Sequence, residues 1–219
     1  MNSNLVRICA LSVILLSSNQ ALADRDFGVG VKVGTLGAGI EGTWRPLPYI
    51  DVRLGANYYE FKDSGSQSGI NYDATLNLES FYGTANFRFP LSPLRVTAGV
   101  FSNGNEFNLA SQDSTFITIG DTTYPTASVG TLSSTTSFDS TAPYLGVGFD
   151  FTVFRKVGLN LDFGVLWQGD PQVSLFADGP IASDPGFQAN LEEERNQLLD
   201  EVSDYKAWPV LSLGFVYNF

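Results

Sequence analysis

The chain has 219 residues, 23 of them acidic and 12 basic, so its formal net charge is −11. This acidic balance argues against nucleic acid as a partner, because phosphate groups are bound by basic surfaces. The sequence contains no histidine and a single cysteine. It therefore lacks the side chain best suited to act as a general base near neutral pH, which argues against a Ser-His or Cys-His nucleophile.

The first 23 residues are predicted to be a secretory signal peptide. Arg7 makes the start positive, residues 8–16 form an apolar run, and residues 21–23 read A-L-A, a typical cleavage site. The apolar run is too short for a membrane-spanning helix. Because cleavage would remove the cysteine as well, we expect residues 24–219 to form one exported domain without a disulfide.

Beyond this segment, apolar residues alternate with small or polar ones in stretches of about ten residues. Alternation places the apolar side chains on one face of a strand. It is typical of transmembrane β-barrels, whose strands lie between lipid and a filled interior. The predicted fold is therefore all-β, an eight-stranded antiparallel transmembrane β-barrel. Its strands are expected at residues 27–33, 36–44, 50–59, 81–89, 94–100, 145–153, 157–167 and 209–219.

The first two segments meet at Gly34-Thr35, where the apolar face changes from odd to even positions. Such a change indicates either a tight turn or a β-bulge. A bulge would merge the two segments and leave seven strands. We favour the turn, because bacterial barrels have an even number of strands.

Three short connections (45–48, 90–93 and 155–156) alternate with three long polar ones, at about 62–73, 104–141 and 168–205. In bacterial barrels the short turns are periplasmic and the long loops lie outside. Counting eight strands puts every long connection on the outer side. We therefore expect both chain termini in the periplasm.

The last long connection carries the one helix signal, at 185–205. Asp184 can cap the helix and Pro185 suits its first position. The helix is acidic and could serve as a lid or docking element, or it could simply pack one face on the outer loops. Its apolar stripe is expected to comprise Phe187, Leu191, Leu198, Val202 and Tyr205.

Four positive and four negative side chains fall on the predicted interior face of the strands. An eight-stranded barrel is just wide enough for side chains to fill it, and unpaired buried charges are costly. We therefore predict that these groups pair and plug the lumen. The alternative is a gated polar path in which the pairs exchange partners. The residues are Lys32, Glu41, Asp51, Arg53, Arg88, Arg95, Asp150 and Asp162.

The segment 209–219 reads P-V-L-S-L-G-F-V-Y-N-F. Ser212, Gly214, Tyr217 and Phe219 occupy the polar, glycine and two aromatic places of a known pattern. The segment thereby resembles the C-terminal insertion signal of bacterial outer-membrane β-barrels.

Taken whole, residues 26–219 resemble the small OmpA- and OmpX-type outer-membrane β-barrel superfamily. The middle segments resemble an uncharacterised gammaproteobacterial group at K-V-G-T-L-G (32–37), G-I-N-Y-D (69–73), A-P-Y-L-G (142–146) and W-P-V (208–210). The resemblance implies an integral protein of the Gram-negative outer membrane, in contact with outer-membrane lipid and lipopolysaccharide. It also implies insertion by the barrel-assembly machinery with periplasmic chaperones.

The sequence thus favours a non-enzymatic barrel with a structural or surface-interaction role. Outer-membrane barrels that are enzymes depend on histidine, and no motif here places two carboxylates together, although a carboxylate-only hydrolase stays formally possible. No metal-ligand spacing or cofactor motif is found. The alternative function is a narrow channel for small or apolar solutes, as a resemblance to OmpW-type barrels would allow.

Overall fold

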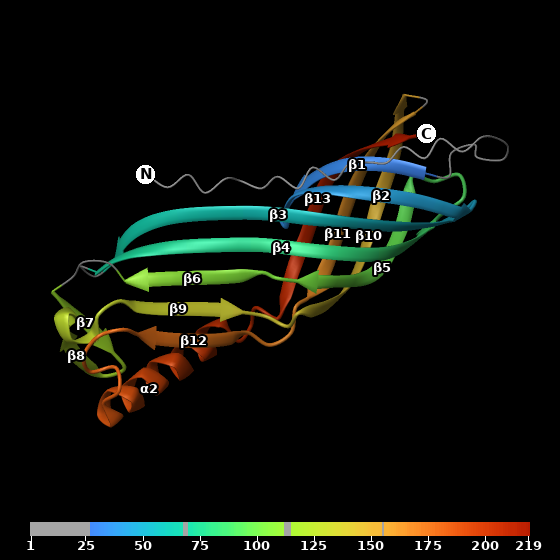
Figure 1. Cartoon of the computed structure of the whole chain (residues 1–219). Coiled ribbons are helices and arrows are strands. Elements are labelled where there is room, and N and C mark those ends of the chain that lie inside the picture. The colour runs from blue at the N-terminus through green and yellow to red at the C-terminus, as the bar shows by residue number, and fades with distance from the viewer. Residues whose placement is uncertain (1–26, 68–69, 112–114, 155) are drawn as a thin grey trace.

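The computed structural model describes residues 27–67, 70–111, 115–154 and 156–219, so the predicted signal peptide lies outside the described residues. Eight antiparallel strands close into a barrel, and β13 pairs with β1 to complete it (Figure 1). The predicted eight-stranded barrel is confirmed. Its strands are β1 (Phe27–Gly34), β2 (Gly37–Leu47), β3 (Ile50–Gln67), β4 (Ile70–Arg88), β5 (Leu94–Asn103), β10 (Thr141–Phe154), β11 (Val157–Trp167) and β13 (Ala207–Asn218).

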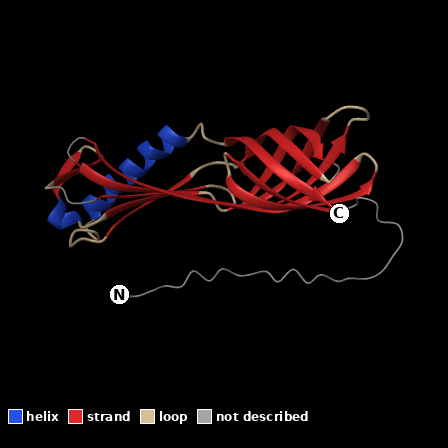
Figure 2. Cartoon of the chain, turned by 90° about the horizontal axis from the view of Figure 1, so that it is seen from above, coloured by secondary structure: helices blue, strands red, loops and turns tan. Residues whose placement is uncertain are grey.

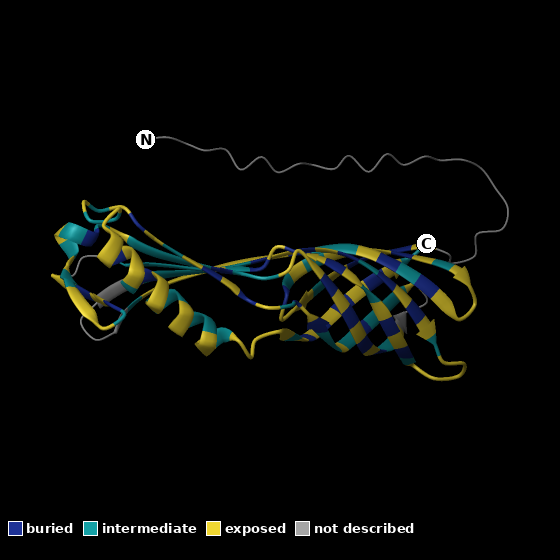
Figure 3. Ribbon diagram, turned by 90° about the horizontal axis from the view of Figure 1, so that it is seen from below, coloured by how far each residue is buried: buried dark blue, intermediate teal, exposed yellow. Residues whose placement is uncertain are grey.

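The alternating sequence pattern separates two faces of the barrel wall. Val29, Val31 and Val33 of β1 are 57%, 58% and 59% exposed on the outside. The positions between them face the lumen, where β1 lies against the lumen-facing residues of β13 and β2. Buried and exposed residues therefore alternate in a chequered pattern around the barrel (Figure 3).

The β1–β2 connection is a two-residue turn at Thr35 and Leu36, with Gly34 paired to Gly37. The turn, and not the bulge, is therefore present. Gly37 has a φ of +95°, which favours glycine. Leu36 was expected on the outer apolar face, and this is wrong: its side chain is 5% exposed because it packs among buried residues at the barrel mouth.

Beyond the barrel, β3 and β4 continue as a long ribbon (Figures 1 and 2). The free edge of β4 pairs with β6 (Glu106–Ser111), and β9 (Leu132–Ser137) and β12 (Gln172–Ala177) follow. The long polar connections therefore contribute strands to an outer sheet in the order β12-β9-β6-β4-β3. An exposed strand edge offers unpaired backbone groups, so even a Ser/Thr-rich segment such as β9 can pair there.

The outer sheet has one apolar and one polar face. Tyr59 and Phe61 of β3 continue the lumen-facing row of that strand, and they lie opposite Leu78 and Leu76 of β4. The polar face carries alternate residues such as Glu60. The apolar face is thus a continuation of the inner wall of the barrel.

Two small elements and one helix cover part of this apolar face. They are the hairpin of β7 (Phe116–Ile119) and β8 (Thr122–Pro125), the single turn α1 (Thr126–Val129), and α2 (Pro185–Val202). β7 and β8 form a two-stranded sheet of their own, separate from the barrel and the outer sheet. Among the described residues, neither helix is long and apolar enough to cross a membrane.

Helix α2 begins as predicted and ends earlier. Asp184 accepts hydrogen bonds from the backbone N–H of Gly186 and Phe187, at 2.9 and 3.0 Å. Phe187 and Leu191 are buried in a cluster with Ile117 and other residues under the helix. Tyr205 was expected on the same stripe, and this is wrong: α2 ends at Val202, and Tyr205 is 63% exposed in the turn that leads to β13.

Candidate functional site

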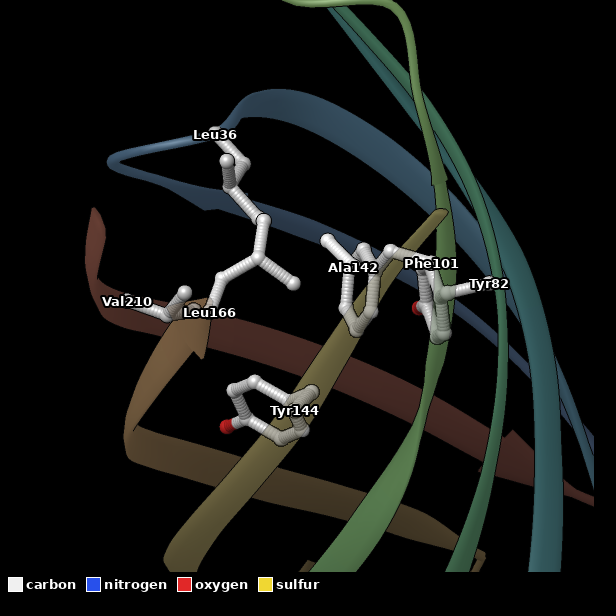
Figure 4. Close-up of a cluster of buried hydrophobic side chains, with 7 residues drawn as sticks. All are labelled: Leu36, Tyr82, Phe101, Ala142, Tyr144, Leu166 and Val210. Carbon is white, nitrogen blue, oxygen red and sulfur yellow. The ribbon is translucent and has the colours of Figure 1, made fainter. Parts of the chain in front are cut away.

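The lumen is crossed by two layers of side chains, and the first is an apolar layer at the end nearest the outer sheet. The rings of Tyr82 and Phe101 stack at 4.8 Å between centroids, and Phe101 lies 5.3 Å from Tyr144. The side chains point toward one another inside the barrel (Figure 4). The apolar layer comprises Leu36, Tyr82, Phe101, Ala142, Tyr144, Leu166 and Val210.

Inward glycines make room for these rings. A Cβ at Gly164 would lie 2.6 Å from the Tyr144 ring, and one at Gly55 would overlap the Tyr82 ring. Real Cβ atoms do not approach other atoms this closely. The glycines of the inner wall therefore leave the space that the aromatic rings at the barrel mouth occupy.

The second layer, the charge layer, lies next to the apolar layer on the side of the short turns. Asp150 of β10 is its centre: it lies 3.4 Å from Arg53 Nη2, 2.9 Å from Arg88 Nη1 and 3.1 Å from Arg95 Nε. These arginines come from β3, β4 and β5. One carboxylate therefore ties together four of the eight strands.

Two further carboxylates complete this network. Asp51 is fully buried and pairs with Arg53 at 3.4 Å and with Arg88. Asp162 of β11 lies 2.5 Å from Arg95 Nη2. Because Arg53 and Arg95 are 3% and 1% exposed, these are desolvated pairs, and removing one partner would leave a buried charge.

Glu41 connects the two layers. Its Oε1 lies 3.3 Å from Arg53 Nη1, and its Oε2 accepts a 3.0 Å hydrogen bond from the Tyr82 hydroxyl. Lys32 is placed differently from the other predicted charges. Its Nζ lies 3.9 Å from the centre of the Tyr82 ring, a cation–π contact. The structure thus brings seven of the eight predicted charges into ion pairs and sets Lys32 against the apolar layer.

Little free space remains between the layers. A cavity bounded by Lys32, Arg95, Tyr144 and other residues of both layers has a volume of about 20 Å³. That is room for about one water molecule.

Sequence reasoning missed one charged residue of the lumen, Arg45. Its neighbours Pro46 and Pro48 indicated a turn. In the structure β2 runs to Leu47, and Arg45 lines a cavity of about 180 Å³ at the short-turn end. The alternation Glu41, Thr43, Arg45 was the signal that could have found it.

The residues of the proposed insertion signal lie on β13. Ser212 faces the lumen, where its hydroxyl donates to Asp162 at 3.3 Å, and Gly214 pairs with Lys32 of β1. Tyr217 and Phe219 are exposed on the outside, with ring centroids 5.4 Å apart. Their role in insertion stays a prediction.

A third cavity lies in the outer sheet. It has a volume of about 450 Å³ and is lined by Leu109, Leu132 and Leu175 of the sheet, Ile117 of β7, and Leu198 of α2, among others. Glu194 stands at its wall and accepts a 2.8 Å hydrogen bond from the backbone N–H of Gly120. Within the described ranges no three carboxylates, histidines or cysteines gather as metal ligands would.

The architecture is an eight-stranded β-barrel whose strands β3 and β4 continue into an outer sheet. Comparison by sequence finds no matching family model and no matching curated protein. Comparison by structure finds Acinetobacter baumannii CarO2, with a TM-score of 0.58 and 24% identity over 88% of this chain and 98% of that one. A. baumannii CarO gives 0.56 and 24% identity over 88% and 97%. A major outer membrane protein from Thermus thermophilus gives 0.40 and 16% identity over 90% and 100%. At 24% identity the likeness to the two CarO proteins concerns the fold.

Proposed function

We propose that the chain is a non-enzymatic, integral outer-membrane β-barrel with a closed lumen, and that its outer sheet has a structural or surface-interaction role. The observation that carries the proposal is the pair of layers across the lumen. An ion pair between Arg53 and Asp150 spans the interior, and the stacked rings of Tyr82 and Phe101 fill the mouth beside it.

The outer surface of the barrel supports the membrane assignment. Leu54, Ile40 and Leu211 of three strands are 65%, 64% and 50% exposed, and apolar side chains of this kind surround the barrel. A continuous apolar band is unfavourable in water and is the lipid-facing surface of a membrane barrel. We place the protein in the outer membrane, among the OmpA- and OmpX-type barrels, with lipid and lipopolysaccharide around it.

The orientation follows the connections. We propose that the short turns and both termini face the periplasm, and that the outer sheet with α2 projects from the cell. Protease treatment of whole cells tests this: cleavage between residues 168 and 205 in intact cells is expected. Cleavage that requires a permeabilised outer membrane would overturn it. Insertion by the barrel-assembly machinery predicts that depletion of that machinery removes the heat-modifiable folded form.

The absence of histidine supports the non-enzymatic assignment. Purified protein is therefore expected to turn over neither lipid nor peptide. Turnover that is lost when one acidic residue, such as Asp162, is replaced by asparagine would overturn it.

A narrow channel for small or apolar solutes is the second candidate, and the outer cavity favours it. That cavity opens on the apolar sheet face, which continues along β3 and β4 into the lumen wall. A solute bound there would still meet the apolar layer and the charge layer. Swelling of proteoliposomes in small apolar solutes separates the candidates: no swelling beyond protein-free liposomes supports the closed barrel, and solute-dependent swelling supports the channel.

A further inference from the structure

The short-turn end of the lumen contains a polar cavity that the closed-barrel function does not use. Its volume is about 180 Å³, enough for several water-sized molecules. Arg45, Arg53 and Arg88 line it, together with Asp150 and the small polar side chains Thr43, Thr152, Asn160 and Asn218. The cavity thus has three guanidinium groups and one carboxylate in its wall.

The cations in the described lumen outnumber the carboxylates. Glu41, Asp51, Asp150 and Asp162 are all ion-paired with Arg53, Arg88 or Arg95. Lys32 lies on the Tyr82 ring. The remaining cation is Arg45, which makes no ion pair with any described carboxylate. Excess positive charge is therefore concentrated at this cavity.

Two buried polar atoms of β2 also have no hydrogen-bond partner among the described protein atoms. They are Arg45 Nε and Thr43 Oγ1. The two residues are separated by one position, so they share the lumen-facing side of the strand and border the same cavity. Buried donors without a protein partner are uncommon in folded proteins, so these two atoms are available to donate to a group bound in the cavity.

We propose that this cavity binds a small oxyanion, a carboxylate or phosphate group, through the Arg45 guanidinium and the Thr43 hydroxyl, with Arg88 beside it. The planar guanidinium matches the geometry of two anion oxygens. Thr43 supplies a neutral donor, and the charge of the bound anion balances the one positive charge by which the cations of the described lumen exceed its carboxylates. The group belongs either to a free solute or to a phospholipid headgroup at this end of the barrel.

The test is a titration of the full folded chain, in a phosphate-free nonionic detergent, with inorganic phosphate followed by phosphorus NMR at constant ionic strength. Saturable binding is expected. Arg45→Gln removes charge-assisted hydrogen bonds and should weaken it by about 10- to 100-fold. Thr43→Val keeps the shape of the side chain and should weaken it by about 2- to 10-fold.

Arg195→Gln is the matched control, because Arg195 lies on α2, away from the lumen, and is expected to leave the affinity unchanged. Thr43→Val decides the matter if Arg45→Gln does not fold. Wild-type protein without saturable binding would overturn the proposal, and so would equal affinities of the wild type, Arg45→Gln and Thr43→Val. Equal loss in the Arg195 variant would indicate nonspecific charge attraction and would overturn it too.

Repeating the titration in phospholipid nanodiscs separates the two sources of the anion. Unchanged affinity assigns the site to a free solute. Competition by the bilayer assigns it to a headgroup phosphate. Either result keeps the oxyanion site in place.

Discussion

Arg53 of β3 and Asp150 of β10 form an ion pair across the lumen, with Nη2 and Oδ1 3.4 Å apart. Their strands are not neighbours, because β4 and β5 lie between them in the barrel. Asp150 also pairs with Arg88 and Arg95. A single carboxylate thus contacts three guanidinium groups, and it links strands that are not neighbours in the barrel wall.

Replacing this carboxylate is expected to destabilise the barrel strongly. Asp150→Asn keeps the size of the side chain but leaves Arg53, Arg88 and Arg95 with less negative charge nearby. Removing one partner of a buried ion pair costs about 3–5 kcal/mol. Urea unfolding in detergent, followed by heat-modifiable migration on a gel, should show a loss of this size.

Asp170→Asn is the matched control for that substitution. Asp170 is 81% exposed and pairs with Lys206 at 2.6 Å, and this contact raises the pKa of Lys206 above its ordinary value. Exposed pairs contribute little, so the unfolding midpoint should hardly move. Equal effects of the two substitutions would contradict the central position of Asp150.

The link between the two layers can be measured through Tyr82 and Glu41. Tyr82→Phe removes a 3.0 Å hydrogen bond to a buried carboxylate and keeps the stacked ring. The expected cost is about 1.5–3 kcal/mol in the free energy of unfolding. A double-mutant cycle with Glu41→Gln should give a coupling energy above about 0.5 kcal/mol, and additive effects would show that the layers are independent.

Replacing a glycine by alanine should have different effects on the free energy of unfolding at the lumen-facing and the outward-facing side of the barrel wall. At Gly55 a Cβ would overlap the Tyr82 ring, so Gly55→Ala should cost about 1–3 kcal/mol. Gly42 is on the outside, and its nearest neighbour would be a backbone oxygen at 4.0 Å. Gly42→Ala should therefore be neutral or stabilising, by up to about 1 kcal/mol. Unfolding curves of the two variants check this, and a stable Gly55→Ala protein would contradict the packing of the mouth.

The cap of α2 should control the helix and leave the barrel unaffected. Asp184→Ala removes both hydrogen bonds to the first turn and should destabilise the helix by about 1 kcal/mol. Hydrogen exchange in residues 185–202 should become faster, while β1 and β13 keep their protection. Glu201→Ala, an exposed change near the other end of α2, is the control and should change neither.

The barrel strands could be predicted from the sequence because an apolar outer face and a filled lumen impose a period of two on the side chains. The same alternation placed Arg53 and Arg95 inside. Arg45 was not predicted to face the lumen, because the prolines beside it indicated a turn, whereas β2 continues past them at the barrel rim. The sequence of β9 has no alternation of apolar and polar residues that would predict a strand. Its Ser and Thr residues pair with β6 through the backbone, and β6 in turn pairs with the free edge of β4, so the strand depends on contacts distant in the sequence. Leu36 does not follow the alternation because it lies in the turn between β1 and β2, where a side chain is not restricted to one face of the sheet.

Single-channel recording in planar bilayers tests the closed lumen most directly. The wild-type protein is expected to show no reproducible openings over protein-free membranes, because the apolar layer and the charge layer both cross the lumen. Reproducible wild-type openings that disappear when Arg53 or Arg95 is replaced by alanine would show that ions pass between these charges, and they would contradict the closed barrel.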